Sequence, residues 1–169
     1  DRIVVIFLGD GAMETGVVHE SLNFASLKNL PIIFVCENNL YSVYTSLSDR
    51  QPKNNSLCKI AEAHKIKSFY ADGNDSELVF NTTNICLNYM RESSKPAFLE
   101  LPTYRWREHC GPNYDNDIGY RSETEFENWL ESDPLNKREA SSKDLDEEVR
   151  RLFGYESWND YKKNNFKDL

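Results

Sequence analysis

Residues 3–36, IVVIFLGDGAMETGVVHESLNFASLKNLPIIFVC, decide the fold. Residues 3–8 form a continuous apolar run rich in β-branched side chains, which predicts a strand buried on both faces. Residues 15–28 carry apolar side chains at helical spacing, and residues 32–36 form a second apolar run. A strand, a helix and a strand within about 35 residues make a βαβ unit, so the two strands should be parallel.

The chain continues with the same alternation of helix and strand. The next elements are predicted over residues 56–64 (helix), 65–71 (strand), 75–91 (helix) and 96–104 (strand). Residues 46–56 are polar and typical of a loop. Residues 105–121 are too polar for a core element and too long for a tight turn, so we expect a functional loop there. The predicted fold class is α/β, with a parallel sheet in a domain over residues 1–121.

Residues 122–169 are charged and follow a helical pattern. They predict a helical C-terminal extension, with helices over residues 123–130 and 142–153. The apolar side chains of this extension could pack on a neighbouring subunit or cap their own domain.

Composition argues against several classes of protein. The 169 residues carry 20 basic and 28 acidic side chains, a formal charge of −8, which argues against a nucleic-acid or anionic-membrane partner. No apolar run approaches the length of a membrane-spanning helix. The four cysteines form no C-x-x-C pair, which argues against a zinc or thioredoxin-type site and favours reduced thiols in a cytosolic or matrix compartment.

Polar motifs follow the two strands of the βαβ unit. Gly9-Asp10-Gly11 comes directly after the first strand, and Asn38-Asn39 comes directly after the second. The carboxyl ends of parallel strands open on the same edge of the sheet, where ligands of such sheets bind. Free backbone amides beside the glycines suit a phosphate. Asp10 and Asn39 offer one anionic and one neutral oxygen, a set that suits a Mg²⁺ completed by phosphate oxygens and water.

Two familiar phosphate motifs are absent, and a plain structural explanation stays open. No Gly-Lys-Ser/Thr follows, as a P-loop requires, and Glu14 stands where the G-x-G-x-x-G fingerprint needs its third glycine. Taken singly, Asp-Gly is a turn dipeptide and Asn-Asn a loop segment. Their occurrence together at matched strand ends favours a binding site.

A family resemblance is carried by several segments of the chain. They are residues 9–45 (GDGAMETGVVHESLNFASLKNLPIIFVCENNLYSVYT), 71–75 (ADGND), 95–109 (KPAFLELPTYRWREH), 119–126 (GYRSETEF) and 132–135 (SDPL). Together they resemble the α subunit of 2-oxo acid dehydrogenase E1 components, with its thiamine-diphosphate motif. The resemblance is to the E1 α chains of the pyruvate, branched-chain and acetoin dehydrogenases. The resemblance covers most of residues 1–135 and implies a thiamine-diphosphate-binding fold.

The resemblance also implies a set of site residues. In that family the aspartate and the second asparagine of these motifs bind Mg²⁺, together with a backbone carbonyl two residues further on. The corresponding metal ligands here are Asp10, Asn39 and Tyr41. The amides of Gly11 and Ala12 would face the diphosphate. The full implied cofactor-binding set is Gly9, Asp10, Gly11, Ala12, Asn39, Tyr41 and His109.

His109 is the catalytic candidate. It ends a Tyr-Arg-x-x-x-His stretch that in the family lies on a loop over the cofactor. The resemblance implies that His109 stabilises or protonates the intermediate after decarboxylation, or assists acyl transfer. The other histidines, His19 and His64, fall on predicted helices and are expected to be structural.

The loop around His109 departs from the family pattern. Relatives commonly carry His-Gly before the catalytic histidine and a phosphorylatable serine after it, whereas this chain has Arg107-Glu108 and Cys110. Control by phosphorylation at that position is therefore unsupported, and the substrate stays open. A carboxylate or phosphate of the substrate could be bound by Arg105, Arg107 or Arg121. The same arginines could instead hold the loop by pairing with Glu108, Asp115 or Asp117.

The resemblance implies the C-terminal portion of an E1 α subunit that uses thiamine diphosphate and Mg²⁺. The implied reaction is oxidative decarboxylation of a 2-oxo acid, with acyl transfer to a lipoyl carrier. In the family, the preceding part of the α subunit and a glutamate of the β subunit complete the site. The implied partners are a β subunit in an α2β2 heterotetramer, a lipoyl-bearing E2 component and a 2-oxo acid. The favoured location is a bacterial cytoplasm, ahead of a mitochondrial matrix.

Two alternatives stay open. The first is a related thiamine-diphosphate-dependent decarboxylase or ketol transferase that acts on a phosphorylated or sugar-linked substrate. Only the dehydrogenase would need a lipoyl acceptor or an artificial oxidant. The second is a non-catalytic assembly subunit, against which the intact Asp10, Asn39 and His109 count.

Overall fold

The structure is a computed structural model that describes residues 2–53, 55–134, 147, 150 and 154. The chain divides into two units, Asp1–Phe126 and Glu127–Leu169. The first unit holds the sheet and the predicted site. The boundary predicted between residues 121 and 122 stays a prediction.

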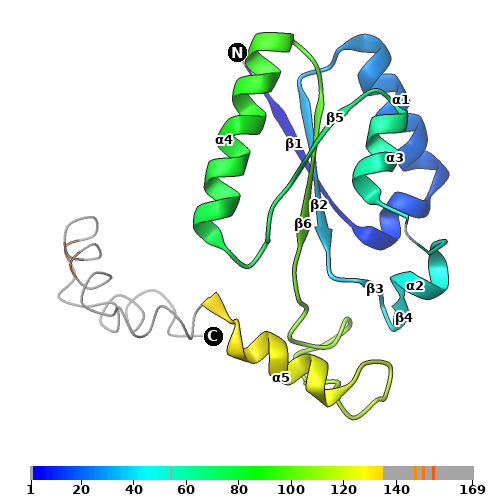
Figure 1. The fold of residues 1–169 in the computed structure, drawn as a ribbon, viewed down its shortest axis with the longest axis vertical. Coiled ribbons are helices and arrows are strands. Elements are labelled where there is room, and N and C mark those ends of the chain that lie inside the picture. Colours follow the sequence, from blue (N-terminus) through cyan, green and yellow to red (C-terminus); the bar gives the residue numbers. More distant parts are fainter. Residues whose placement is uncertain (1, 54, 135–146, 148–149, 151–153, 155–169) are drawn as a thin grey trace. The chain divides into compact units, whose positions relative to one another are not determined.

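A parallel sheet forms the centre of the first unit (Figure 1). In the described part of the chain its strands lie in the order β1, β2, β6 and β5, and each neighbouring pair is parallel. The strands are β1 (Val4–Gly9), β2 (Ile32–Asn38), β6 (Ala97–Pro102) and β5 (Lys67–Tyr70). This sheet confirms the predicted parallel α/β class.

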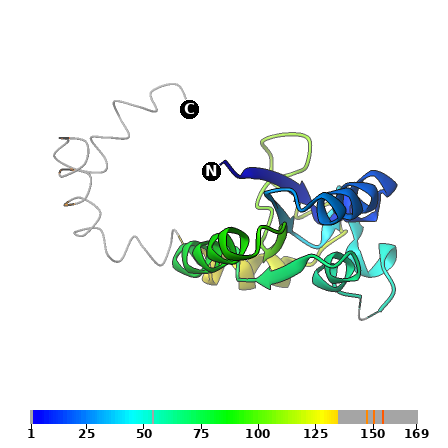
Figure 2. The same ribbon diagram turned by 90° about the horizontal axis from the view of Figure 1, so that it is seen from above.

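Helices cover both faces of the sheet (Figure 2). On one face, α1 (Gly16–Lys28) and α3 (Leu57–Ala63) pack their apolar side chains against Phe34 of β2 and Phe98 of β6. On the other face, α4 (Ser76–Ser93) packs against Val35 and Leu99. Successive β2 residues therefore face opposite layers, as expected of a central parallel strand.

Local signals place the helix ends close to their predicted positions. Ser56 accepts a hydrogen bond from an amide in the first turn of α3, and Asp75 does the same for α4. Asn29 ends α1 in the left-handed conformation, with φ of 50°. These are ordinary N-cap and C-cap residues, which explains why the pattern of the sequence was sufficient here.

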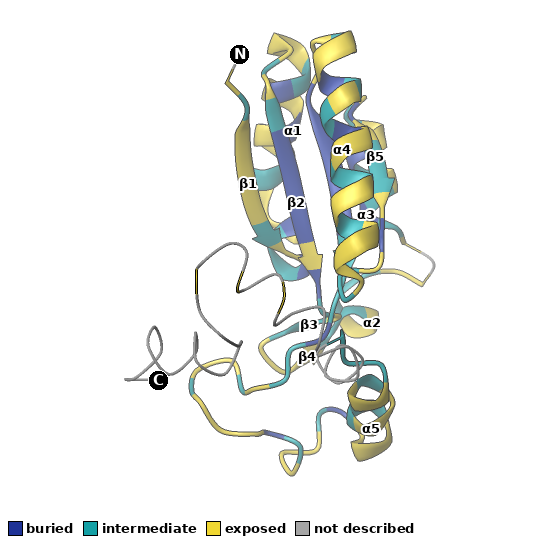
Figure 3. Ribbon diagram, turned by 90° about the vertical axis from the view of Figure 1, so that its left-hand side faces the viewer, coloured by how far each residue is buried: buried dark blue, intermediate teal, exposed yellow. Residues whose placement is uncertain are grey.

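The β1 prediction is wrong in one respect, because this strand is exposed rather than buried on both faces (Figure 3). Val4 is 52% exposed and Phe7 is 66% exposed. β1 lies at the edge of the described sheet and pairs only with β2. Its residues Val4 to Phe7 belong to neither core cluster of the described residues, so an apolar run alone did not determine burial.

Short elements that the sequence did not predict surround the carboxyl edge. They are a 3-10 turn η1 (Asp10–Glu14), a small hairpin of β3 (Tyr41–Ser42) and β4 (Thr45–Ser46), and the one-turn helix α2 (Leu47–Arg50). The hairpin and the helix occupy residues 41–50. Residues 46–50 of this region fall in the loop that was predicted over residues 46–56. Each is too short to leave a periodic pattern.

The C-terminal region is described only in part. Helix α5 (Glu123–Glu131) confirms the helix predicted over residues 123–130. The helix predicted over residues 142–153 lies outside the described residues, except for Glu147 and Arg150. Among the helices that the structure describes, none is both long and apolar enough to cross a membrane.

Candidate functional site

Asp10 lies at the carboxyl end of β1, where the chain turns into η1. Asp10 is only 1% exposed. Because aspartate is seldom buried without a partner, a partner is expected. The partner is Arg50 at the end of α2, whose Nη2 forms an ion pair with Oδ2 of Asp10. Arg50 also pairs with Glu14 in η1 through Nη1. No sequence pattern indicates this arginine, because it lies forty residues from Asp10 in a polar stretch.

The Asn38-Asn39 motif forms a tightly bonded turn after β2. Oδ1 of Asn38 accepts from the Leu40 amide at 3.1 Å, and Oδ1 of Asn39 accepts from the Tyr41 amide at 3.0 Å. Leu40 lies in the left-handed region, with φ of 68°. These side-chain-to-backbone bonds explain why two successive asparagines are present at this bend.

Glu100 holds the turn from the neighbouring strand β6. Its Oε1 accepts from Nδ2 of Asn38 at 2.9 Å, and its Oε2 accepts from the Cys58 thiol at 3.2 Å. Glu100 is 7% exposed. Burial and the hydrogen bond to Glu100 raise the pKa of the Cys58 thiol to about 12. The sequence signal for this role is a single glutamate inside an apolar strand, and it was not among the predicted site residues.

The Gly-Asp-Gly and Asn-Asn motifs lie side by side, as their strand positions predict. A Cβ added at Gly11 would come within 2.8 Å of Oγ of Ser42, in the β3 strand that follows the Asn-Asn turn. Only glycine allows this approach without movement of Ser42. At Gly9, in contrast, a Cβ would meet no atom within 4 Å, so space is open beside the strand end.

The donors at this edge fit a hard divalent cation that takes further ligands from elsewhere. Oδ1 of Asp10 accepts no hydrogen bond from the residues that the structure describes. Oδ1 of Asn39, which accepts one bond from the Tyr41 amide, and the Tyr41 carbonyl could add neutral oxygens. No group of three or more His, Cys, Asp or Glu residues that could hold a metal occurs in the described ranges. A dedicated protein cage is thus absent there, whereas a Mg²⁺ shared with a diphosphate remains compatible.

Residues 105–121 form the predicted loop, and a buried carboxylate organises it. Asp115 is fully buried, and it accepts from Nη2 of Arg121 at 2.5 Å and from the Tyr120 hydroxyl at 2.7 Å. Arg105 approaches the same carboxylate at 3.5 Å. Burial alone would raise the pKa of Asp115, but the hydrogen bonds from Tyr120 and Arg121 outweigh it, so the pKa lies below its ordinary value.

The three loop arginines have partners in the loop itself. Arg105 and Arg121 pair with Asp115, which is one of the two arrangements that the sequence left open. The Arg107 guanidinium lies 3.9 Å from the centroid of the Tyr114 ring and donates to the Pro112 carbonyl at 3.0 Å. Neither Glu108 nor Asp117 forms an ion pair in the described part of the chain.

The loop is docked on the hairpin that follows the Asn-Asn turn. Nη2 of Arg105 donates to the Val43 carbonyl at 2.9 Å, and the Tyr120 ring meets the Tyr41 ring edge-on at 5.1 Å between centroids. The Tyr41 hydroxyl donates to Oε2 of Glu125 at 2.9 Å. Burial and this bond raise the pKa of Tyr41 to about 12. The loop that carries His109 therefore lies at the same edge as the two motifs.

His109 itself is exposed on this loop. It forms no hydrogen bond or ion pair with the residues that the structure describes, so the structure does not join it to Asp10 or Asn39. The two other histidines face one another: Nδ1 of His19 on α1 lies 3.1 Å from Nε2 of His64 after α3. Burial and the neighbouring His19 hold the pKa of His64 below its ordinary value.

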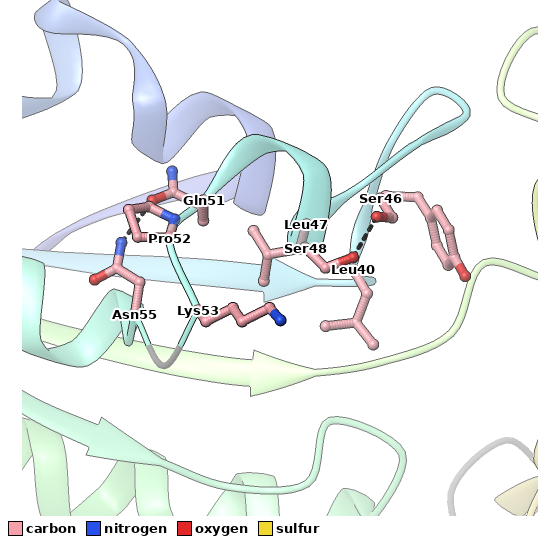
Figure 4. Close-up of a pocket in the computed structure, with 9 residues that line it drawn as sticks. Leu40, Ser46, Leu47, Ser48, Gln51, Pro52, Lys53 and Asn55 are labelled. Carbon is pink, nitrogen blue, oxygen red and sulfur yellow. Dashed lines mark hydrogen bonds between the residues drawn. The ribbon is translucent and has the colours of Figure 1, made fainter.

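A pocket of about 440 Å³ opens beside the Asn-Asn turn (Figure 4). Leu40 and Tyr41 line it from the Asn-Asn turn and β3, Ser46 lines it from β4, and the remaining residues belong to α2 and the segment after it. The lining residues are Leu40, Tyr41, Ser46, Leu47, Ser48, Gln51, Pro52, Lys53 and Asn55. This pocket was not predicted, because the polar residues 46–56 are typical of a connecting loop.

Known proteins share both sequence and fold with this chain. The Rickettsia felis pyruvate dehydrogenase E1 component subunit alpha is 37% identical over 163 residues, which cover 90% of this chain and 49% of that protein. The Arabidopsis thaliana mitochondrial 2-oxoisovalerate dehydrogenase subunit alpha 1 is 30% identical over 134 residues, covering 79% of this chain and 28% of that protein. The chain thus spans about half the length of the Rickettsia felis protein and a smaller share of the Arabidopsis thaliana protein.

The fold has a counterpart among solved structures. A transketolase from Pichia stipitis superposes with a TM-score of 0.52 at 20% identity, over 61% of this chain and 15% of that one. This similarity concerns the fold alone. The sequence model of the dehydrogenase E1 component family matches residues 1–143. The chain accordingly belongs to the dehydrogenase E1 component family.

Proposed function

We propose that this chain is part of an E1-type α subunit that binds thiamine diphosphate through Mg²⁺. The observation that carries the proposal is the packing of Gly11 against Ser42, which brings the Gly-Asp-Gly and Asn-Asn motifs together at the carboxyl edge of the sheet. The buried carboxylate of Asp10 lies at this edge. Family membership agrees with this assignment of the site.

Mg²⁺ would be held by Asp10, Asn39 and the backbone carbonyl of Tyr41. The main chain at Gly9, Gly11 and Ala12 would bind and orient the diphosphate, since space is open beside Gly9. When bound, thiamine diphosphate supplies the carbanion chemistry that decarboxylation needs. The contribution of this chain is to anchor the diphosphate end and to fix its orientation.

His109 is the proposed catalytic residue of this chain. Its side chain is exposed on a loop that packs against the β3–β4 hairpin, so an imidazole at this position can hold or deliver a proton at the mouth of the site. Asp115 holds the loop in place through its hydrogen bonds. The backbone that carries His109 is thereby ordered, while the ring nitrogens of His109 stay free of hydrogen bonds to the described residues.

The proposed reaction is the oxidative decarboxylation of a 2-oxo acid, with transfer of the acyl group to a lipoyl carrier. The pyruvate and 2-oxoisovalerate dehydrogenase subunits alpha among the relatives support this reaction class. Their names also support a β subunit as partner, which we propose in an α2β2 heterotetramer with a lipoyl-bearing E2 component. A cytoplasmic location in a bacterium is favoured over a mitochondrial matrix.

The loop structure gives little support to a phosphorylated or sugar-linked substrate, which the sequence had left open. Arg105 and Arg121, two of the three arginines available for a phosphate, are held by Asp115. We therefore rank the ketol-transferase alternative and the non-catalytic assembly subunit below the dehydrogenase.

The decisive experiment is calorimetric titration of thiamine diphosphate into the full-length subunit, purified with its partner. We expect binding in Mg²⁺ and none after chelation with EDTA. A folded complex that binds in neither buffer would contradict the proposal. Turnover of 2-oxo acids with and without a lipoyl acceptor then separates the dehydrogenase from its alternatives.

A further inference from the structure

Arg50 makes an unusually sheltered contact with the proposed metal ligand. Its guanidinium pairs with Asp10 through Nη2 and with Glu14 through Nη1, and its Nε donates to the Thr45 carbonyl at 3.1 Å. The Arg50 side chain is 10% exposed and that of Asp10 is 2% exposed. An exposed ion pair contributes little, but this pair is shielded from water, so its loss would leave a buried carboxylate unpartnered.

The contact divides the two carboxylate oxygens of Asp10 between two tasks. Oδ2 is bound by Arg50, whereas Oδ1 accepts no hydrogen bond from the described residues. A guanidinium that is itself fixed by Glu14 and Thr45 restricts the rotation of the carboxylate. This contact limits the orientations that are open to Oδ1.

We propose that Arg50 is a positioning residue that presents Oδ1 of Asp10 to Mg²⁺. This inference rests on the proposed function, because it takes Asp10 as a Mg²⁺ ligand. Carboxylates that bind metals are commonly hydrogen-bonded by an outer layer of residues, and those residues tune metal affinity. Arg50 also offsets the charge of Glu14, which would otherwise add a second uncompensated carboxylate beside the site.

The same contact connects the metal site to the pocket of Figure 4. Arg50 is the last residue of α2, and Leu47 and Ser48 of that helix line the pocket. The ion pair thus joins α2, which lines the pocket, to the residue that follows β1. A ligand bound against α2 would contact a surface whose position depends on Asp10.

The test is a Mg²⁺ titration at a fixed thiamine diphosphate concentration, on the full-length subunit with its partner. Calorimetry or tryptophan fluorescence reports binding without turnover. In Arg50→Gln we expect the half-saturating Mg²⁺ concentration to rise about tenfold or more, the range typical of outer-layer ligands. Arg50→Lys keeps the positive charge but loses the guanidinium that contacts Asp10 and Glu14 at once, so a smaller rise in the half-saturating Mg²⁺ concentration is expected.

Arg91→Gln is the matched control, since Arg91 is an exposed residue of α4 that bonds only to Asn88 on its own helix among the contacts described. It should leave the half-saturating concentration unchanged. An unchanged value in Arg50→Gln would overturn the proposal and leave Arg50 as a fastener of α2. A lower value would also overturn it, because the guanidinium would then compete with Mg²⁺ for Asp10.

Two further outcomes keep this test separate from that of the function. If the unsubstituted complex shows no Mg²⁺-dependent binding, the proposed function fails, and the assignment of Arg50 fails with it. If the unsubstituted complex binds normally, only the Arg50 result is at stake. Should Arg50→Gln not fold, as judged by circular dichroism, Arg50→Lys decides: a raised value supports the proposal and an unchanged value overturns it.

Discussion

The two parts of the candidate site are built in different ways. At the strand ends, the sheet places Asp10 and the Asn38-Asn39 turn, bonds between residues two apart shape the turn, and Arg50 and Glu100 each hold one side chain. In the 105–121 loop, order depends on side chains that converge on the single carboxylate of Asp115. Substitutions at the strand ends should therefore affect ligand binding locally, whereas substitutions in the loop should affect its conformation as a whole.

The largest effect is expected for Asp10→Ala. This change removes the anionic metal ligand and leaves Arg50 without its buried partner. Magnesium-dependent binding of thiamine diphosphate should be abolished in calorimetry, while Asp117→Ala, at an exposed loop position, should bind normally. Unchanged affinity in Asp10→Ala would refute the metal assignment.

Asp115→Asn tests the other part of the comparison. Neutralising this buried carboxylate leaves Arg121 without its ionic partner, which typically costs about 3 kcal/mol. Hydrogen exchange of the loop amides should accelerate about a hundredfold, while Mg²⁺-dependent cofactor affinity persists. Asp117→Asn is the matched control. Equal exchange in the two variants would show that Asp115 does not organise the loop.

His109→Ala sharpens the comparison, because it removes a loop side chain that holds nothing else in place among the described residues. Turnover with a 2-oxo acid should fall about a hundredfold, the lower end of general acid–base effects, with a much smaller loss of cofactor affinity because Asp10 and Asn39 remain. The neighbouring Cys110→Ala, also exposed, should retain turnover. A parallel loss of cofactor affinity in His109→Ala would instead assign His109 to binding.

The smallest effect is a pH dependence away from both parts of the site. The pKa of His64 is lowered by burial and by His19, so the unfolded chain binds this proton more readily than the folded one. The free energy of unfolding should therefore fall as the pH drops below about 6.5 and level off below the folded pKa. Urea denaturation across this interval should show the slope, and His64→Gln should remove it. A slope that survives in His64→Gln would point to other groups.

Much of the fold was predictable because its signals are local. The apolar run of β2, the helical spacing of α4 and its Asp75 cap each lie within one element. The strand-end motifs followed from topology, since parallel strands bring their carboxyl ends to one edge. The packing of Gly11 against Ser42 agrees with that expectation.

The rest depended on contacts between distant residues. Arg50 meets Asp10 across forty positions, and Glu100 meets Asn38 across sixty-two, so no short pattern announces either pair. Whether a loop arginine faces a substrate or Asp115 depends on the loop conformation, which composition does not specify. The exposure of β1 shows the same limit, because burial depends on what lies against a strand as well as on its side chains.

The bare edge of β1 has a practical consequence for anyone who handles residues 1–169 in isolation. One row of its amides and carbonyls pairs with no strand among the described residues, and an apolar strand with such an edge is a template for adding another strand. Phe7 and its exposed apolar neighbours would add hydrophobic contacts to the hydrogen bonds of such an added strand. Expression of this stretch alone should therefore favour inclusion bodies.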